Sequence, residues 1–225
     1  MNHASSSKRL FVLGATGGTG LAIVEQAIAR GHRVTAFVRS PHKLAPRDGL
    51  TIVRGDPFDA KAIEVALAGH DAVLSALGPP GPGPTTIAGD GARAVVAAMQ
   101  AAGVRRLLVV GVAVLFENAG FFASILRRTL LRNVADDSAE MERIVTASDL
   151  EWTIARPPRL TNGPARGAYG IADDALPGGA GGFATIRRAD VAHFLLNELE
   201  HPAHRRRIVG IAHAKRAVME AHATH

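Results

Sequence analysis

The sequence predicts an α/β fold in which a doubly wound parallel sheet carries helices on both faces. Six short apolar segments of strand character alternate with amphipathic helical segments, as a parallel sheet with crossover helices requires. The glycine-rich stretch 14–20 joins the first of these strands directly to the first helix. Such a strand–turn–helix is how open α/β sheets of the Rossmann type build a phosphate-binding turn. We therefore expect a Rossmann-type sheet.

The predicted elements follow one another without an internal repeat. The strands are expected at 9–14, 33–38, 50–55, 72–76, 106–112 and 152–156. The helices are expected at 18–30, 59–67, 86–102, 136–147 and 190–199. Gly31, Gly69 and Gly103 stand where three of these helices should end, as a left-handed cap requires.

Two segments interrupt the alternation. Residues 78–84 contain four prolines and three glycines, so they predict a loop at the carboxyl end of the fourth strand. Ligands bind at that end of the strands in open α/β sheets. Residues 162–183 are also rich in glycine and proline and predict loops over the same edge. They are either a substrate lid or a plain surface excursion.

The composition is that of an ordinary globular domain. The chain has 225 residues, 47% of them hydrophobic, so we expect one domain over 1–225 with a flexible leader at 1–7 and a helical or frayed tail at 212–225. The sequence shows neither a membrane-spanning apolar run nor a signal peptide, which predicts a cytoplasmic protein without a membrane partner. We expect a monomer or a homodimer.

Charge and residue usage exclude several other classes of function. The net charge of +6 comes from dispersed arginines and aromatic residues make up only 4%, a pattern that does not favour nucleic-acid binding. The chain has no cysteine, and its ten histidines lack carboxylates at ligand spacing, so no metal site is expected. Redox chemistry would therefore need a bound organic cofactor.

The glycine turn is the best candidate for a dinucleotide site. Gly14, Gly17 and Gly20 recur at every third residue between a strand and a helix. Glycine is needed where the turn demands backbone angles that a Cβ forbids and where a diphosphate must approach bare main chain. A glycine-rich turn without a ligand is the alternative, which the position between strand and helix disfavours.

The stretch after the second predicted strand favours NADP over NAD. An NAD site usually has an acid there for the ribose hydroxyls, whereas a 2′-phosphate needs positive charge. Residues 36–43 contain no acid but include Arg39 and Lys43. Arg39 can bind a phosphate with two parallel N–H groups and Lys43 can add a second charge. An arginine that faces solvent at the start of a helix is the other interpretation.

Three further candidates lie at the ends of predicted strands. Asp56 is placed to accept the adenine amino group, or it caps the next segment. Leu77 and Gly78 follow the fourth strand, beside the expected diphosphate and ribose. Gly111, near the end of the fifth, allows main chain to approach the nicotinamide or serves tight packing.

Several motifs together carry a resemblance to a known family. They are residues 14–20, 38–40, 55–56, 84–86, 91–99, 152–164 and 167–169. The chain resembles the atypical short-chain dehydrogenases of the NAD(P)-binding, NmrA-like group, and within it the biliverdin-IXβ (flavin) reductases. The resemblance implies an NADPH-dependent reductase that passes hydride to a flavin, a quinone or a linear tetrapyrrole. It implies cofactor contacts at Gly14, Thr16, Gly17, Gly18, Thr19, Arg39, His42, Lys43, Asp56, Leu77, Gly78 and Pro157.

The chain also departs from that pattern. The reductases have a Thr-Ser pair where this chain has Gly111 and Val112, and a histidine where it has Arg159. Ordinary short-chain dehydrogenases have a Tyr with a Lys four residues later, yet Tyr169 is the one tyrosine and Asp173 stands at that spacing. The usual proton donor for carbonyl reduction is thus missing. Arg159 is the candidate catalytic residue: it would hold an anionic group of the acceptor or stabilise negative charge, unless it forms a surface ion pair.

These departures keep more than one function open. Hydride transfer to a flavin or quinone needs no strong protein acid, and we expect an apolar site walled by Val112, Leu115, Phe116 and Pro158. The NmrA-like group also includes redox sensors that bind NADP without turnover. A sugar-nucleotide epimerase fits less well because it too needs the tyrosine. Ser138 and Glu140 are better explained by ordinary helix capping than by chemistry.

Overall fold

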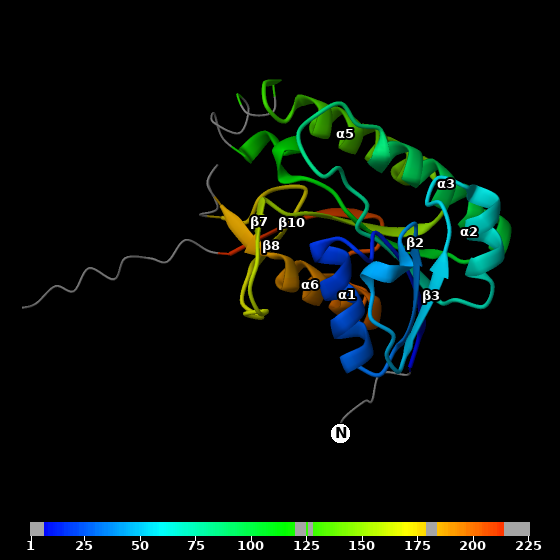
Figure 1. Ribbon diagram of the computed structural model, residues 1–225. Helices are drawn as coiled ribbons and strands as arrows, with labels where there is room; N and C mark the ends of the chain where they lie inside the picture. The colour runs from blue at the N-terminus through cyan, green and yellow to red at the C-terminus, as the bar shows by residue number, and fades with distance from the viewer. Residues whose placement is uncertain (1–6, 120–124, 126–127, 179–183, 214–225) are drawn as a thin grey trace, which may run out of the picture.

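The computed structural model of the chain describes residues 7–119, 125, 128–178 and 184–213, and within them a large sheet dominates (Figure 1). Its eight strands have the order β3-β2-β1-β4-β5-β6-β10-β8. They are β1 (Arg9–Leu13), β2 (Arg33–Val38), β3 (Leu50–Arg54), β4 (Ala72–Ser75), β5 (Arg106–Val110), β6 (Glu151–Arg156), β8 (Gly170–Asp173) and β10 (Arg207–Ala212). All neighbours pair in parallel except β8, which runs antiparallel to β10.

Helices cover both faces of this sheet (Figure 1). The described α-helices are α1 (Gly18–Ala29), α2 (Ala60–Leu67), α3 (Ile87–Ala102), α5 (Arg132–Ala147) and α6 (Arg188–Glu200). Short 3₁₀ turns lie at η1 (Pro41–Lys43), η2 (Ala113–Leu115) and η3 (Glu117–Ala119). Helices α1 and α6 pack together on one face, and α2, α3 and α5 pack in a row on the other. A buried apolar core therefore lies on each side of the sheet.

The predicted fold class is confirmed. The order β3-β2-β1-β4-β5-β6 is that of a doubly wound dinucleotide-binding sheet, with β10 and β8 added at one edge. Strand β2 has the predicted bounds, and the other predicted strands differ by one or two residues at an end. Gly31, Gly69 and Gly103 have φ angles of 84°, 73° and 70°, as expected of residues that end helices.

Three local predictions were wrong. Residues 162–183 are not all loop, because β8 lies within them, and the predicted tail at 212 begins inside β10, where Ala212 is buried. Strands β8 and β10 pair with each other although they are far apart in the sequence. Val209 pairs with Asp173 and Ala212 with Gly170. No local sequence pattern indicates such a pairing. Helix α5 starts at Arg132, one turn before the predicted residue 136.

The ends of the chain lie mostly outside the described residues. Of the predicted leader 1–7 only Ser7 is described, and its hydroxyl donates a hydrogen bond to the Gly31 carbonyl at 2.7 Å. The predicted tail beyond His213 is not described, so one domain over 1–225 stays a prediction. None of the helices within the described ranges is long and apolar enough to cross a membrane.

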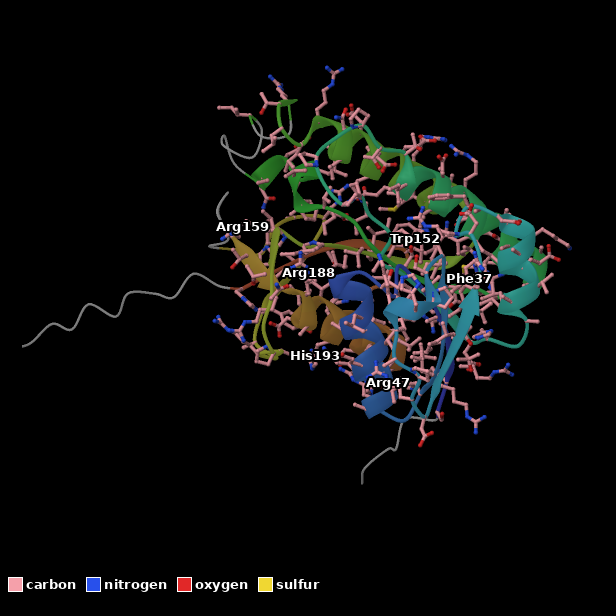
Figure 2. The ribbon with its side chains drawn as sticks, in the orientation of Figure 1. Phe37, Arg47, Trp152, Arg159, Arg188 and His193 are labelled. Atoms are coloured by element: carbon pink, nitrogen blue, oxygen red, sulfur yellow. The ribbon has the colours of Figure 1, made fainter. Side chains whose placement is uncertain are left out.

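Two short strands form a small second sheet at the carboxyl edge of the large one. Strand β7 (Arg159–Thr161) pairs in parallel with β9 (Thr185–Arg187), and Leu160 faces Ile186 in the register. Helix α6 follows β9 without a break, so its first residue, Arg188, is held near the start of α1 (Figure 2). Two helix starts from distant parts of the chain thereby meet at one edge of the sheet.

Candidate functional site

The site is organised by the crevice between β1 and β4. The chain leaves β1 toward β2 on one side and returns through β4 on the other, which makes this the switch point of the sheet. Gly14 follows β1 with a φ of 75°, and a Cβ there would lie 2.5 Å from the Ala76 carbonyl oxygen. The predicted need for glycine at position 14 is thus met by both backbone angle and close approach. The crevice opens at the carboxyl ends of both strands.

A first cavity of about 340 Å³ extends from the glycine turn toward β2. Gly14, Thr16 and Gly17 line it on one side, and Leu77 and Gly78 line it on the other. It also extends to Arg39, at the carboxyl end of β2. The structure therefore brings six of the predicted cofactor contacts around one hollow. None of the described residues that line it carries a carboxylate.

Three other predicted contacts lie beside this cavity. His42 and Lys43 are exposed and line a shallow depression of their own, next to Ile52. Asp56 is exposed, and its Oδ1 accepts a hydrogen bond from the backbone N–H of Phe58 at 3.1 Å. That bond is the local capping role foreseen for Asp56. Whether these side chains reach a cofactor stays a prediction.

Phe58 is a lining residue that the sequence reasoning missed. It follows Pro57 at the far end of the first cavity, and its ring is 37% exposed although it is a large apolar side chain. An exposed aromatic face in a cavity is suited to stack on a planar base. The sequence signal that could have identified Phe58 is its position two residues after Asp56, just beyond the end of β3.

We expect Phe58→Ala to weaken coenzyme binding by about 5- to 20-fold, as the loss of one stacking contact does. Affinity for NADPH, measured by fluorescence titration, tests this. Val65→Ala removes an exposed apolar side chain of α2 outside the cavity and is the matched control. Equal affinity of the two variants would show that Phe58 does not contact the adenine.

A second cavity of about 540 Å³ lies on the other side of the glycine turn, toward β5 and α5. Its wall contains Gly17, Gly18 and Thr19 of the turn, together with Gly111 at the end of β5. Most of the remaining surface is apolar, supplied by residues that include Pro79, Val112, Leu130, Leu131, Val134 and Leu160. Within the described part of the chain, Arg188 is the one titratable side chain in this lining.

Gly111 is packed tightly against a buried ion pair. A Cβ at this position would lie 3.0 Å from Glu142 Oε1 and 3.3 Å from Ile154 Cγ2. Arg156 donates hydrogen bonds from Nε to Glu142 Oε1 at 2.8 Å and from Nη2 to Oε2. The packing role foreseen for Gly111 therefore applies, and Gly111 also lines the second cavity.

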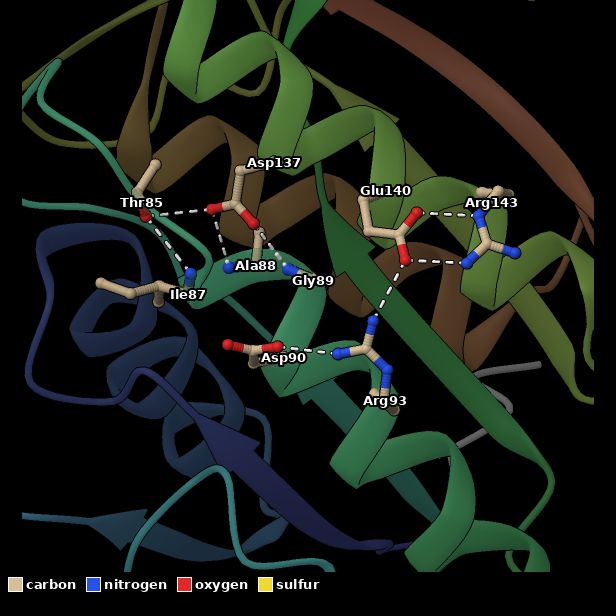
Figure 3. A network of polar contacts seen from close by, with 9 residues as sticks. All are labelled: Thr85, Ile87, Ala88, Gly89, Asp90, Arg93, Asp137, Glu140 and Arg143. Atoms are coloured by element: carbon tan, nitrogen blue, oxygen red, sulfur yellow. Dashed lines mark hydrogen bonds and ion pairs between the residues drawn. The ribbon is translucent and has the colours of Figure 1, made fainter.

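Helix α5 fixes the start of α3 through a buried carboxylate (Figure 3). Asp137 accepts hydrogen bonds from the N–H groups of Ala88 and Gly89, at 3.0 and 2.8 Å, and from the Thr85 hydroxyl at 3.0 Å. It thus supplies the cap that α3 lacks at its own N-cap residue. The proline-rich loop just before α3 is held against α5 as a result.

The capping interpretation of Ser138 and Glu140 was wrong. Because α5 begins at Arg132, neither residue lies at its N-terminus. Glu140 pairs with Arg93 and Arg143 across the surface of α3 and α5 (Figure 3). Ser138 is instead buried and lines the second cavity, so its hydroxyl is a polar group beside the apolar wall.

Of the residues predicted to surround the acceptor, only some line the second cavity. Val112 lines the second cavity, but Phe116 is buried in a separate small core, where the Arg156 guanidinium lies 4.6 Å from its ring centre. Leu115 and Pro158 are half-buried and do not line that cavity. The prediction that Phe116 forms the wall was therefore wrong.

Arg159 and Pro157 lie next to the second cavity without lining it. Arg159 is exposed on β7 (Figure 2). Its neighbour Leu160 contributes to the wall of the second cavity. Pro157 is buried, and its carbonyl accepts a hydrogen bond from Ala113 N–H at 3.0 Å. The catalytic role of Arg159 and the cofactor contact of Pro157 stay predictions.

Tyr169 lies away from both cavities. Its hydroxyl lies 2.9 Å from His193 Nδ1 on α6, and burial, with the charge of Asp190, raises the pKa of Tyr169 to about 12. Burial also lowers the pKa of His193, which favours the neutral imidazole. This pair packs a loop onto α6 and supplies no acid to the site. Among the described residues no cluster of metal ligands occurs.

A doubly wound sheet with a glycine turn at its switch point and cavities on both sides of that turn defines a dinucleotide-binding α/β protein. Comparison with known families then identifies the particular one. The chain belongs to the NAD(P)H-binding family, whose model matches residues 14–202.

Other proteins resemble this chain over most of its length. The uncharacterised protein YwnB of Bacillus subtilis is 29% identical over 205 residues, which cover 88% of this chain and 94% of YwnB. A candidate NADH-flavin reductase of Streptococcus pneumoniae is 26% identical with a TM-score of 0.76, covering 92% of this chain and 100% of that one. A Burkholderia pseudomallei protein described as a candidate exported protein is 27% identical with a TM-score of 0.77, at 92% and 100% coverage.

Proposed function

We propose that this protein is an NADPH-dependent reductase that passes hydride to a flavin, a quinone or a linear tetrapyrrole. The observation that carries the proposal is the second cavity, which is apolar and adjoins the glycine turn but has no carboxyl, imidazole or phenol in its described lining. Reduction of a carbonyl to an alcohol needs a proton donor there, whereas reduction of a delocalised ring system does not. The candidate NADH-flavin reductase of Streptococcus pneumoniae shares this fold.

The residues of the glycine turn bind and orient the coenzyme in this proposal. The backbone N–H groups at the start of α1 face the diphosphate, and Gly14 and Gly17 let it approach. Leu77 and Gly78 border the first cavity opposite the turn and hold the ribose and adenine side. The bound coenzyme would supply the hydride, and the chain's own residues exclude water from the acceptor.

Arg39 supports NADP rather than NAD. It is the cation in the described lining of the first cavity, where the second strand ends, and none of the described lining residues is an acid that could bind ribose hydroxyls. A guanidinium binds a phosphate through two parallel N–H groups. His42 and Lys43 add positive charge just outside that cavity. A cytoplasmic location and a monomeric or homodimeric state remain predictions.

The experiment that tests this function has two parts. Calorimetry measures the affinity for NADPH and NADH, and the near-ultraviolet absorbance of NADPH then reports its oxidation with FMN, FAD, a quinone or biliverdin added. Turnover with at least one acceptor supports the reductase. Tight NADPH binding without turnover on any of them would contradict it and favour the redox-sensor alternative. The absence of any binding would contradict both.

A further inference from the structure

We propose that Arg188 is a coenzyme-positioning residue whose guanidinium covers the diphosphate of the bound dinucleotide, and that position 18 is glycine to leave room for it. The inference rests on the coenzyme part of the proposed function, not on turnover. It assigns a role to an arginine 170 positions away from the glycine turn in sequence, on a different helix.

The glycine turn contains one glycine more than its spacing needs. Gly14, Gly17 and Gly20 form the three-residue repeat, and Gly20 is required because a Cβ there would lie 2.1 Å from the Gly14 carbonyl oxygen. Gly18 is outside the repeat. A Cβ on Gly18 would lie 2.7 Å from Arg188 Cδ and 3.0 Å from its Nε. The side chain of Arg188 thus occupies the space that any other residue at position 18 would fill.

In the described part of the chain, no carboxylate forms a hydrogen bond or ion pair with Arg188. Its Nη1 donates a hydrogen bond to Asn162 Oδ1 at 2.7 Å, which is a neutral partner, and no ion pair joins it to another described residue. Asp190, two residues later, is turned to the N–H groups of Arg166 and Gly167 and to His213. The guanidinium is therefore oriented by an amide but not neutralised.

The start of α1 adds positive potential at the same place. Gly17 makes no side-chain cap, and the first turn of α1 contains no acidic residue, so its free N–H groups and the helix dipole are uncompensated. A cation beside a positive helix end is unfavourable until an anion lies between them. A dianionic diphosphate fits this place better than a neutral acceptor, since each phosphate can accept from both sides.

Arg188 also borders the second cavity, so an anionic group of the acceptor is the competing ligand. The contact with Gly18 favours the coenzyme, because that residue belongs to the turn on which the diphosphate lies. Covering the diphosphate from α6 would fix the coenzyme at the border between the two cavities. The nicotinamide end of the coenzyme would then be directed to the second cavity.

The test compares Arg188→Ala with Arg187→Ala, a neighbouring arginine whose Nη1 donates to the Pro164 carbonyl at 2.8 Å and which lines neither cavity. Arg188→Ala should weaken binding of NADPH and of adenosine 2′,5′-bisphosphate by about 10- to 100-fold, the usual effect of losing a charge-assisted contact. Adenosine 2′-monophosphate, which lacks the 5′-phosphate, should bind both variants like the wild type. Circular dichroism melting confirms that each variant is folded.

Gly18→Ala provides an independent test, since its methyl group must displace Arg188. It should lower NADPH affinity by a similar factor, and the double variant Gly18→Ala with Arg188→Ala should lose little more than either alone. Additive losses would overturn the inference. The inference would also be overturned if Arg188→Ala left the NADPH affinity unchanged and raised the KM for FMN but not for riboflavin. That result would place Arg188 on the acceptor. Wild-type protein that binds NADPH but reduces nothing would end the reductase proposal and leave this one standing.

Discussion

Arg39→Asp is expected to reverse the coenzyme preference, lowering NADPH affinity by about 100-fold while NADH affinity stays level or rises. Arg39 is the cation that lines the first cavity, and the described lining has no second one to replace it. In the proposed binding mode, the substitution removes two charge-assisted hydrogen bonds from Arg39 to the 2′-phosphate and puts a carboxylate in their place. The same carboxylate can accept from the hydroxyls of an unphosphorylated ribose, which is why NADH is not penalised.

Calorimetry with both coenzymes measures this reversal, and Arg47→Asp is the matched control. Arg47 precedes the turn at Gly49, which packs near Ile28 at the far end of α1, so the same change of charge occurs away from the cavity. Arg47→Asp should leave the ratio of the two affinities unaltered. An Arg39→Asp protein that keeps its preference for NADPH would show that the 2′-phosphate does not lie beside β2.

The residues that line the first cavity could be predicted to lie together from sequence because their determinants are local. Gly14 is required by a φ of 75° inside one short turn, and Arg39 directly follows a strand whose bounds the pattern of apolar residues predicted. Leu77 and Gly78 follow the next central strand in the same way. In a parallel sheet all these strand ends meet at one edge, so the sequence order alone places them together.

The second cavity could not be predicted in the same way because its wall is assembled from distant segments. Arg188 of α6 lies beside Gly18 of the glycine turn, although the two are far apart in sequence. Ser138 lines the second cavity from within α5, not from its start. Phe116 has an apolar side chain at the expected position, yet it is buried under Arg156. Which face a side chain presents depends there on packing that no local pattern contains.

The ion pair between Glu142 and Arg156 also escaped sequence reasoning, and it explains how α5 is fixed to the sheet. The two side chains are 7% and 13% exposed, and the Arg156 guanidinium is further enclosed by the Phe116 ring. The pair lies directly behind Gly111, so it holds the wall of the second cavity in place. A buried ion pair adds little net stability, because both charges lose their hydration when they are buried. Removing one partner is strongly destabilising, because the other charge is then buried without a partner.

Glu142→Ala should therefore destabilise the protein by about 3–5 kcal/mol, which corresponds to a melting temperature lower by about 6–20 °C for a chain of this size. Glu140→Ala is the matched control, because Glu140 is on the same helix and pairs with two arginines, but its side chain is 38% exposed. Solvent screens such surface pairs, so that variant should melt close to the wild-type temperature. Thermal melts of both variants measure the difference. Replacing both Glu142 and Arg156 by methionine should restore most of the lost stability, because no charge is then left buried. Equal melting temperatures for Glu142→Ala and Glu140→Ala would refute this account of how α5 is held.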